Sequence, residues 1–363
     1  MSEATVQNIE TTIVSATVPY LESDLGATGI STQVELSSGT ARVRLTLDFP
    51  AAGIASRLSE DLRQRIIEQG GVADAEVLVD WRIRAQAVQG ALVPLPNIKN
   101  IIAVASGKGG VGKSTTAVNL ALALAIEGAR VGILDADIYG PSQPQMLGLS
   151  GQQPVTRDGK TFEPLEAFDI QAMSIGFLVP QDRAVIWRGP MVTQALNQLV
   201  FQTNWRDLDY LIVDLPPGTG DTQLTLTSKV PVSGAIIVTT PQDIALLDAR
   251  RGLKMFEKVN VRILGVVENM STYICSECGH EEPIFGTGGG ERLTQESGLP
   301  LLGELPLDVR IRREADSGEP TVVSDPDSAI ALKYREIARR AAARLAAGPR
   351  DHKAAFPKIV VES

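Results

Sequence analysis

The sequence predicts an α/β protein in which a small α+β domain precedes a doubly wound, mostly parallel β-sheet. Three observations lead to this fold class. In the larger part of the chain, short apolar runs alternate with segments long enough for helices, as in sheets that helices cover on both faces. A glycine-rich segment follows the first of these runs. The composition also changes near residue 95, which indicates two folded parts.

Composition places the chain among folded globular proteins. Of its 363 residues, 44% are hydrophobic and 21% are charged, which excludes global disorder and a fibrous chain. The 34 basic and 43 acidic residues give a net charge of −9, so we expect neither nucleic acid nor an anionic membrane as a main partner. Two cysteines exclude a disulfide scaffold, and no signal peptide or membrane-spanning run is evident. We therefore expect a cytoplasmic protein.

The domain boundary is predicted near residue 95. No lysine occurs before Lys99, and the two prolines of 94–96 are typical of a short, stiff linker. The predicted organisation is a small α+β domain (1–93), a linker (94–98), the main domain (99–347) and a flexible tail (348–363).

Within the small domain, hydrophobic periodicity predicts three elements. Apolar and polar residues alternate with period two over 41–49 and again over 75–83, which predicts two strands. Between them, Leu58, Leu62 and Ile66 have helical spacing, which predicts a helix over 56–69.

In the main domain, apolar runs without alternation predict strands that are buried on both faces. Patterns long enough for helices separate most of them. A last, basic helix is expected over 331–347, and we interpret it as packing on the sheet because its apolar face is mostly alanine. The predicted strands are 101–105, 131–134, 170–175, 210–213, 235–238, 263–267 and 301–302.

The strongest motif is a phosphate-binding loop between the first main-domain strand and the next helix. It fits the pattern G-x-x-x-x-G-K-S without a mismatch. Its backbone amides would hold phosphate groups at a helix N-terminus, Lys113 would meet the β- and γ-phosphate oxygens, and the Ser114 hydroxyl would ligate Mg²⁺. The predicted nucleotide-binding residues are Gly107, Lys108, Gly109, Gly110, Val111, Gly112, Lys113, Ser114 and Thr115.

A second lysine, Lys108, directly follows the first glycine of this loop. With it the loop resembles the deviant phosphate loop of an ATPase group. That group includes cell-division positioning and chromosome-partition ATPases, nitrogenase iron protein and tail-anchored-protein targeting factors. In that group the extra lysine reaches across a nucleotide-sandwich dimer to the partner's phosphates. The resemblance therefore implies that Lys108 is a catalytic cation acting in trans, as an arginine finger does in other enzymes.

Three aspartates are expected around the bound nucleotide. Asp135 and Asp137 follow one predicted strand and Asp214 ends another, at the carboxyl edge where parallel sheets bind ligands. By similarity to the same ATPase group, Asp137 would orient the attacking water, and Asp135 and Asp214 would hold Mg²⁺. Gly218, shortly after Asp214, would contact the γ-phosphate.

Asn269 is a predicted base-binding residue. It ends the strand predicted over 263–267, and its amide carries both the donor and the acceptor that the adenine edge requires. The alternative is an asparagine that only forms a turn.

Both cysteines lie in one short motif, Cys275-Ser-Glu-Cys278-Gly-His280. Thiolates at this spacing can bind one metal together. A four-thiolate site needs four sulfurs, and one chain supplies two, so a site closed by protein thiolates alone requires two chains. The alternatives are a zinc site completed by His280, a redox pair and a plain turn.

Several further segments narrow the resemblance to one family. Six segments occur in the following order: Trp187-Arg-Gly-Pro-Met, the segment from Leu208 to Asp221, Val266-Val-Glu-Asn-Met, the cysteine motif, Phe285-Gly-Thr-Gly-Gly-Gly and Pro300-Leu-Leu-Gly-Glu-Leu-Pro-Leu-Asp. Together they resemble the Mrp family of iron–sulfur cluster carrier ATPases over about residues 98–325.

This resemblance implies a homodimer that binds and hydrolyses ATP with Mg²⁺ and that holds a [4Fe–4S] cluster between Cys275 and Cys278 of two chains. It also implies cluster transfer to apo iron–sulfur proteins and contact with cluster scaffold proteins. We expect hydrolysis to be slow. Two other functions stay open at this point: a zinc-clamped dimeric targeting chaperone and a positioning ATPase.

The first 90 residues are similar in layout to a small domain that occurs in iron–sulfur assembly factors. That domain commonly carries a Cys-Pro pair, whereas this chain has Asp48-Phe-Pro-Ala-Ala at the corresponding place and no cysteine. Its thiol chemistry is therefore excluded here, and we assign the domain to docking.

Overall fold

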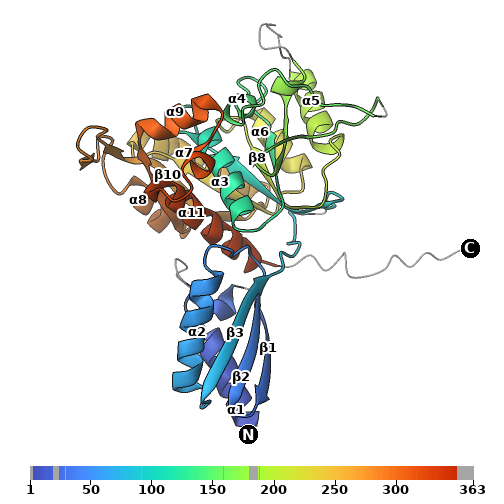
Figure 1. Ribbon diagram of the computed structural model, residues 1–363. Coiled ribbons are helices and arrows are strands. Elements are labelled where there is room, and N and C mark those ends of the chain that lie inside the picture. The colour runs from blue at the N-terminus through green and yellow to red at the C-terminus, as the bar shows by residue number, and fades with distance from the viewer. Residues whose placement is uncertain are drawn as a thin grey trace, which may run out of the picture.

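The computed structural model describes residues 3–18, 24–28, 30–90, 92–157, 159–179, 187 and 189–349. Two β-sheets organise these residues, one of three strands in the first part of the chain and one of nine strands in the rest. Figure 1 shows the small sheet with its helices below the large one.

The small sheet has the strand order β1-β2-β3. β1 (Ile30–Ser37) and β2 (Thr40–Leu47) form an antiparallel hairpin, and β3 (Asp74–Trp81) lies parallel to β2. Helices α1 (Glu3–Val14) and α2 (Ala55–Gln69) pack against each other and against the sheet, and a short 3₁₀ turn, η1 (Leu25–Ala27), follows α1. The predicted helix and both predicted strands are confirmed, whereas α1 and β1 were not expected.

The large sheet has the order β11-β10-β9-β4-β8-β5-β7-β6, with β12 alongside β10. All of its pairs are parallel except β6 with β7 and β10 with β11. The strands are β4 (Ile98–Ala105), β5 (Val131–Asp135), β6 (Leu165–Ala167), β7 (Ile170–Ser174), β8 (Leu208–Asp214), β9 (Gly234–Thr239), β10 (Ile263–Ile274), β11 (Glu281–Glu282) and β12 (Leu301–Leu307).

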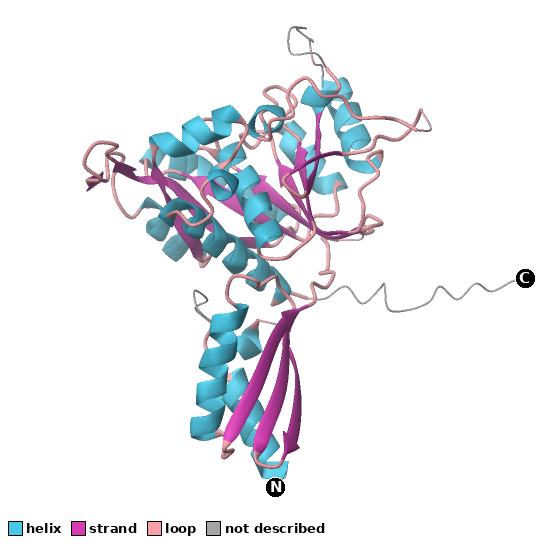
Figure 2. Ribbon diagram, viewed as in Figure 1, coloured by secondary structure: helices cyan, strands magenta, loops and turns pink. Residues whose placement is uncertain are grey.

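Helices cover this sheet on both faces, as Figure 2 shows. Strands β5, β8 and β9 are buried along their whole length, which explains their unbroken apolar sequences. The helices are α3 (Lys113–Ile126), α4 (Gln143–Met146), α5 (Gly189–Phe201), α6 (Asp221–Lys229), α7 (Asp243–Lys258), α8 (Gly289–Ser297), α9 (Val309–Ser317), α10 (Thr321–Ser324) and α11 (Ala329–Ala346), with a 3₁₀ turn η2 (Ile175–Phe177).

The last helix packs as predicted. Ser328 caps the N-terminus of α11, since its Oγ accepts a hydrogen bond of 3.2 Å from the amide of Ala331. Tyr334, Ile337 and Leu345 are buried where α11 lies on α3 and β12. Within the described ranges, no helix is both long and apolar enough to cross a membrane.

The small sheet and its helices contact the large part of the chain at the end of α3. The amides of Ala52 and Gly53 donate hydrogen bonds to the carbonyl oxygen (3.1 Å) and a carboxylate oxygen (2.9 Å) of Glu127. The Trp81 indole donates to the carbonyl of Gly128 over 3.2 Å. Because α3 begins in the phosphate loop and ends at this contact, a single helix connects the two places.

The predicted division of the chain stays a prediction. The two sheets share no strand, and β4 already begins at Ile98, the last residue of the predicted linker. Most of the predicted tail, residues 350–363, lies outside the described residues, as does Arg188 of the family motif.

Candidate nucleotide site and cysteine turn

The phosphate loop joins the carboxyl end of β4 to the first turn of α3. Gly112 has φ +79°, and a Cβ there would lie 2.1 Å from Nδ2 of Asn269. Gly107 approaches α7 so closely that a Cβ would lie 2.2 Å from the carbonyl carbon of Asp248. Glycine is therefore required at both positions, for backbone conformation at one and for close packing at both.

The two lysines of the loop have different surroundings. Lys113 is buried, its Nζ forms an ion pair with the Asp214 carboxylate, and the same Nζ lies 3.1 Å from Oγ of Ser114. Lys108 is half-exposed, and across the described part of the chain it forms no ion pair. The structure thus places Lys113 inside the site and Lys108 at its open side.

Asp135 lies at the end of β5 and is completely buried. Its carboxylate accepts hydrogen bonds from the amides of Ser142 (2.9 Å) and Gln143 (3.0 Å) and from Oγ of Ser174 (3.2 Å). Burial raises the pKa of Asp135 to about 7, and the nearby Asp214 carboxylate adds to the rise. Asp135 therefore ties the loop that follows β5 to the ends of β5 and β7.

Asp137 lies two residues further along and is half-buried. One of its carboxylate oxygens accepts a hydrogen bond of 3.3 Å from the amide of Gly140. Burial raises the pKa of this carboxyl group above its ordinary value, although the positive charge of Lys113 opposes the shift. Asp137 is thus oriented by its own loop and is close enough to Lys113 to interact with its charge.

Gln143 belongs to the site, and sequence analysis missed it. It is 1% exposed, and its Nε2 donates hydrogen bonds to the carbonyl of Ser114 (3.2 Å) and to a carboxylate oxygen of Asp214 (3.0 Å). It therefore connects the loop after β5 with the phosphate loop and with the end of β8. No spacing rule marks a single glutamine after Pro-Ser, so the sequence carried no signal for it.

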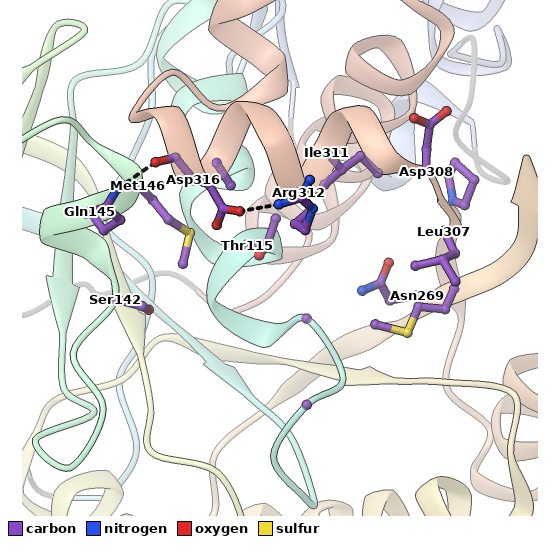
Figure 3. Close-up of a pocket in the computed structure, with 15 residues that line it drawn as sticks. Thr115, Ser142, Gln145, Met146, Asn269, Leu307, Asp308, Ile311, Arg312 and Asp316 are labelled. Carbon is purple, nitrogen blue, oxygen red and sulfur yellow. Dashed lines mark hydrogen bonds and ion pairs between the residues drawn. The ribbon is translucent and has the colours of Figure 1, made fainter. Parts of the chain in front are cut away.

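A cavity of about 440 Å³ opens beside the phosphate loop. Figure 3 shows that side chains from α3, α4, β10 and α9 lie around it. Gln145 donates a hydrogen bond of 2.6 Å to the carbonyl of Asp316, which ties α4 to α9. Within α9, Arg312 bonds the Asp316 carboxylate over 2.8 Å. Sequence analysis did not assign the α9 wall, although the lining residues directly before it, Pro306, Leu307 and Asp308, belong to the segment Pro300–Asp308 that carried the family resemblance.

Asn269 lies in this cavity, at the point on β10 closest to the phosphate loop. Its Nδ2 donates a hydrogen bond of 2.8 Å to the carbonyl of Val111. This bond uses one of the two N–H groups of the amide, so one N–H and the oxygen are left for a ligand. The predicted base-binding residue is therefore also a support of the loop.

Gly218 lies beside the start of the phosphate loop. Its amide donates a hydrogen bond of 3.0 Å to the carbonyl of Ser106, and its φ is +98°. A Cβ at Gly218 would meet no atom within 4 Å, so the glycine borders open space beside the loop.

The two cysteines lie in the turn of a β-hairpin formed by β10 and β11, which projects from the large sheet in Figure 2. The amide of Cys275 donates to the carbonyl of His280 (3.0 Å), and the amide of Gly279 donates to the carbonyl of Cys275 (2.9 Å). Backbone amides of Cys278 and Glu277 and the Cys278 side chain lower the pKa of the Cys275 thiol. The turn thus makes this thiol easier to deprotonate.

Neither cysteine is buried, and Cys278 and His280 are both exposed. Among the residues that the structure describes, no three His, Cys, Asp or Glu side chains lie together as a metal site. In this chain the two thiols therefore form an open pair at the surface.

A family model described as the ParA: NUBPL iron-transfer P-loop NTPase matches residues 97–342. The chain belongs to this family. Relatives of this NUBPL-type NTPase are similar over most of their length. An iron-sulfur cluster carrier protein of Pseudomonas fragi is 59% identical over 278 residues, which cover 76% of this chain and 97% of the relative. The protein of that name from Escherichia coli K12 is 49% identical over 331 residues, or 90% and 89% of the two chains. Mouse iron-sulfur cluster transfer protein NUBPL is 50% identical over 258 residues, or 70% and 81%.

Solved structures agree with the predicted fold class. A nucleotide-binding protein of Archaeoglobus fulgidus in complex with ADP has a TM-score of 0.55 and 35% identity, and the match covers 64% of this chain and 90% of that one. The cell division ATPase MinD of Pyrococcus furiosus has a TM-score of 0.51 and 23% identity, covering 66% and 97%. The large sheet of this NUBPL-type chain thus has the P-loop ATPase fold.

Proposed function

We propose that this protein is an ATP-hydrolysing carrier that holds a [4Fe–4S] cluster between Cys275 and Cys278 of two chains and transfers it to apo iron–sulfur proteins. One observation carries the proposal. Strand β10 contacts the phosphate loop through Asn269 and ends directly before Cys275. We propose that a change at the nucleotide is transmitted along this strand to the cysteine turn. The names of the relatives, cluster carrier and cluster transfer protein, support this function.

The thiol pair supports a cluster shared between two chains. A cubane cluster takes about four thiolates, and each chain supplies Cys275 and Cys278. Both lie at the surface, where the thiols of a second chain can reach the same iron atoms. The amides that lower the pKa of the Cys275 thiol would also stabilise the charge of a thiolate ligand.

The phosphate loop supports Mg²⁺ and ATP as the other ligands. Oxygen donors gather at one end of the loop: Oγ of Ser114, the buried Asp214 carboxylate and a buried Gln143 oxygen that accepts no hydrogen bond from the described residues. Oxygen donors of this kind suit Mg²⁺, so the residues fit the metal. Ser114 would ligate it directly, and Asp135 and Asp214 would hold it through water. The bound metal would neutralise charge on the β- and γ-phosphates.

For hydrolysis we propose the two residues at the open side of the loop. Asp137 would orient the attacking water, and Lys108 of one chain would reach the phosphates held by the other. Lys113 would bind the β- and γ-phosphates, and Gly218 would contact the γ-phosphate. We expect slow turnover, because the trans lysine is in place only when two chains face each other.

We further propose a homodimer in the cytoplasm whose partners are apo iron–sulfur proteins and cluster scaffold proteins, with no nucleic acid and no membrane among them. The small domain would dock partners. It contains no cysteine, so it takes no part in cluster ligation.

Anaerobic reconstitution with iron and sulfide tests this function. The wild-type chain should develop the brown absorption of a thiolate-bound cluster and elute as a dimer. Cys278→Ser should lose the absorption while still binding ATP, whereas Ser276→Ala, in the same turn, should keep both. Tight zinc binding in place of iron would contradict the carrier function and favour a zinc-clamped chaperone.

A further inference from the structure

Gln143 has more hydrogen-bonding capacity than the structure uses. It is the first residue of α4, and its side chain lies between the phosphate loop and the end of β8. Its Nε2 donates both of its hydrogen bonds, to the carbonyl of Ser114 and to the carboxylate of Asp214. Its Oε1 is buried and accepts no hydrogen bond from any part of the chain that the structure describes.

The orientation of this amide is fixed by its two partners. A carbonyl oxygen and a carboxylate oxygen both accept hydrogen bonds, so the nitrogen has to face them. A rotated amide would bring its oxygen against two other oxygens. Oε1 therefore faces away from Ser114 and Asp214 as an unused acceptor, and a buried acceptor without a donor is unfavourable.

The surroundings indicate which donor Oε1 receives. Oε1 faces away from the Asp214 carboxylate, but it shares a carbon with Nε2, which donates to that carboxylate over 3.0 Å. A water bound to a metal beside Asp214 and Ser114 can therefore reach it. Mg²⁺ in proteins keeps several of its waters. Such waters turn their oxygen to the metal and present only hydrogens to the protein, which is what an unused acceptor requires.

We infer that Gln143 is a positioning residue for hydrated Mg²⁺: its Oε1 accepts a hydrogen bond from a metal-bound water while its Nε2 holds the Asp214 carboxylate in place. This inference rests on the proposed function, because it requires that a Mg-nucleotide binds at the phosphate loop. It adds a neutral amide to the serine and the two aspartates expected there.

Calorimetric titration with ADP, in excess Mg²⁺ and again in EDTA, tests the inference on the full chain. In Gln143→Met the side chain has nearly the same size but no acceptor oxygen. The factor by which Mg²⁺ raises ADP affinity should therefore be roughly tenfold smaller than in the wild type. The affinity of this variant in EDTA should change by less than about twofold. Gln143→Glu keeps an acceptor oxygen and should retain most of the gain. Gln152→Met, on an exposed loop, is the matched control.

Thermal unfolding in EDTA checks that each variant is folded, and Gln143→Ala provides the same comparison if the methionine variant is not. Equal losses of affinity with and without Mg²⁺ would show a purely structural role and overturn the inference. If Mg²⁺ raised the ADP affinity of Gln143→Met as much as that of the wild type, the inference would be overturned as well. A wild-type chain that binds ADP equally with and without Mg²⁺ would instead contradict the proposed metal-nucleotide site itself.

Discussion

At the scale of single residues, the site separates groups that look alike in the sequence. Lys108 and Lys113 stand five positions apart in one loop, yet Lys113 is buried against Asp214 and Lys108 is half-exposed. Asp135 and Asp137 stand two positions apart, yet Asp135 is fully buried with four hydrogen-bond donors around it and Asp137 is half-buried. Burial thus separates Lys113 and Asp135, in the interior of the site, from Lys108 and Asp137 at its more open side.

The two lysines should respond differently to substitution. Lys113→Ala removes the buried cation and should abolish ATP binding, whereas Lys108→Ala should leave the affinity nearly unchanged and reduce hydrolysis. Calorimetry and phosphate release measure the two effects separately. If ATP affinity fell equally in both variants, the proposed role of Lys108 across the dimer would be wrong.

Asp137→Asn should keep Mg-ATP bound and slow its hydrolysis. The amide has the size of the carboxylate but is a poor acceptor for a proton from the attacking water. Single-turnover hydrolysis, measured at saturating ATP, isolates this step. Turnover at the wild-type rate would remove Asp137 from the mechanism.

The buried Asp135 predicts a pH dependence of stability in the protein free of nucleotide and metal. The pKa of Asp135 is about 7 in the folded state and has its ordinary value of 3.8 in the unfolded state. At a pH between these two values, the folded state therefore holds a proton that the unfolded state has released. The free energy of unfolding should therefore fall as the pH rises from about 4 to about 7. The stability associated with protonated Asp135 is fully present only below this range.

Urea unfolding at several pH values measures this contribution. Asp135→Asn carries no titrating group and should show a flatter dependence over the same range. Asp169→Asn, on an exposed turn, should follow the wild type. An equally steep fall in Asp135→Asn would mean that another group, such as Asp137, causes it.

At the scale of elements, the junction between the small sheet and α3 is built on one buried carboxylate. Glu127 accepts hydrogen bonds from Arg335 (2.8 Å), Arg339 (2.7 Å) and the amide of Gly53 (2.9 Å). Both arginines come from α11, so this carboxylate joins α3, α11 and the loop after β2. A carboxylate buried with such partners is costly to remove, because both guanidinium groups lose a charged hydrogen-bond acceptor.

Glu127→Ala should lower the free energy of unfolding by about 3–5 kcal/mol, since it removes the buried carboxylate that pairs with Arg339 and the largely buried Arg335. Glu336→Ala removes a carboxylate from the more exposed pair with Arg340 on the same helix and should cost about 0.5 kcal/mol. Urea unfolding of both variants checks the difference. Similar small losses would show that Glu127 does not hold the junction.

The elements that sequence analysis found and missed differ in a physical way. Strands such as β5 and β9 are buried on both faces, so their apolar runs are unbroken and predict them well. β10 was predicted to end at Val267 because polar residues follow, but pairing with β12 and β11 keeps it extended to Ile274. Helix α1 was missed because few apolar residues, such as Ile9 and Ile13, form its buried side.

The same distinction holds for the site. The phosphate loop, the three aspartates and the cysteine pair occur in local motifs, and the structure brings the loop and the aspartates together. Gln143 and the α9 wall were missed because they reach the loop only through the packing of distant segments. Asn269 was found, yet its contact with Val111 depends on how β10 crosses the loop and could not be seen in the sequence.

At the scale of the whole molecule, the nucleotide cavity and the cysteine turn lie at two points of one strand. β10 passes the phosphate loop at Asn269 and continues to the projecting turn, while α3 runs from the same loop to the small domain (Figure 1). The phosphate loop is therefore linked to both the proposed cluster site and the proposed docking domain. This arrangement is what a carrier needs if ATP is to control when a cluster is held or released.

The central claim is that two chains share one cluster, and the most direct test is to measure mass and iron together. Sedimentation of the anaerobically reconstituted full chain, followed at the absorption of the cluster, should show the colour in a dimer with about four iron atoms, two per chain. Cys275→Ser should sediment without colour. A coloured monomer with a full complement of iron, or a dimer that holds zinc and no iron, would contradict the account.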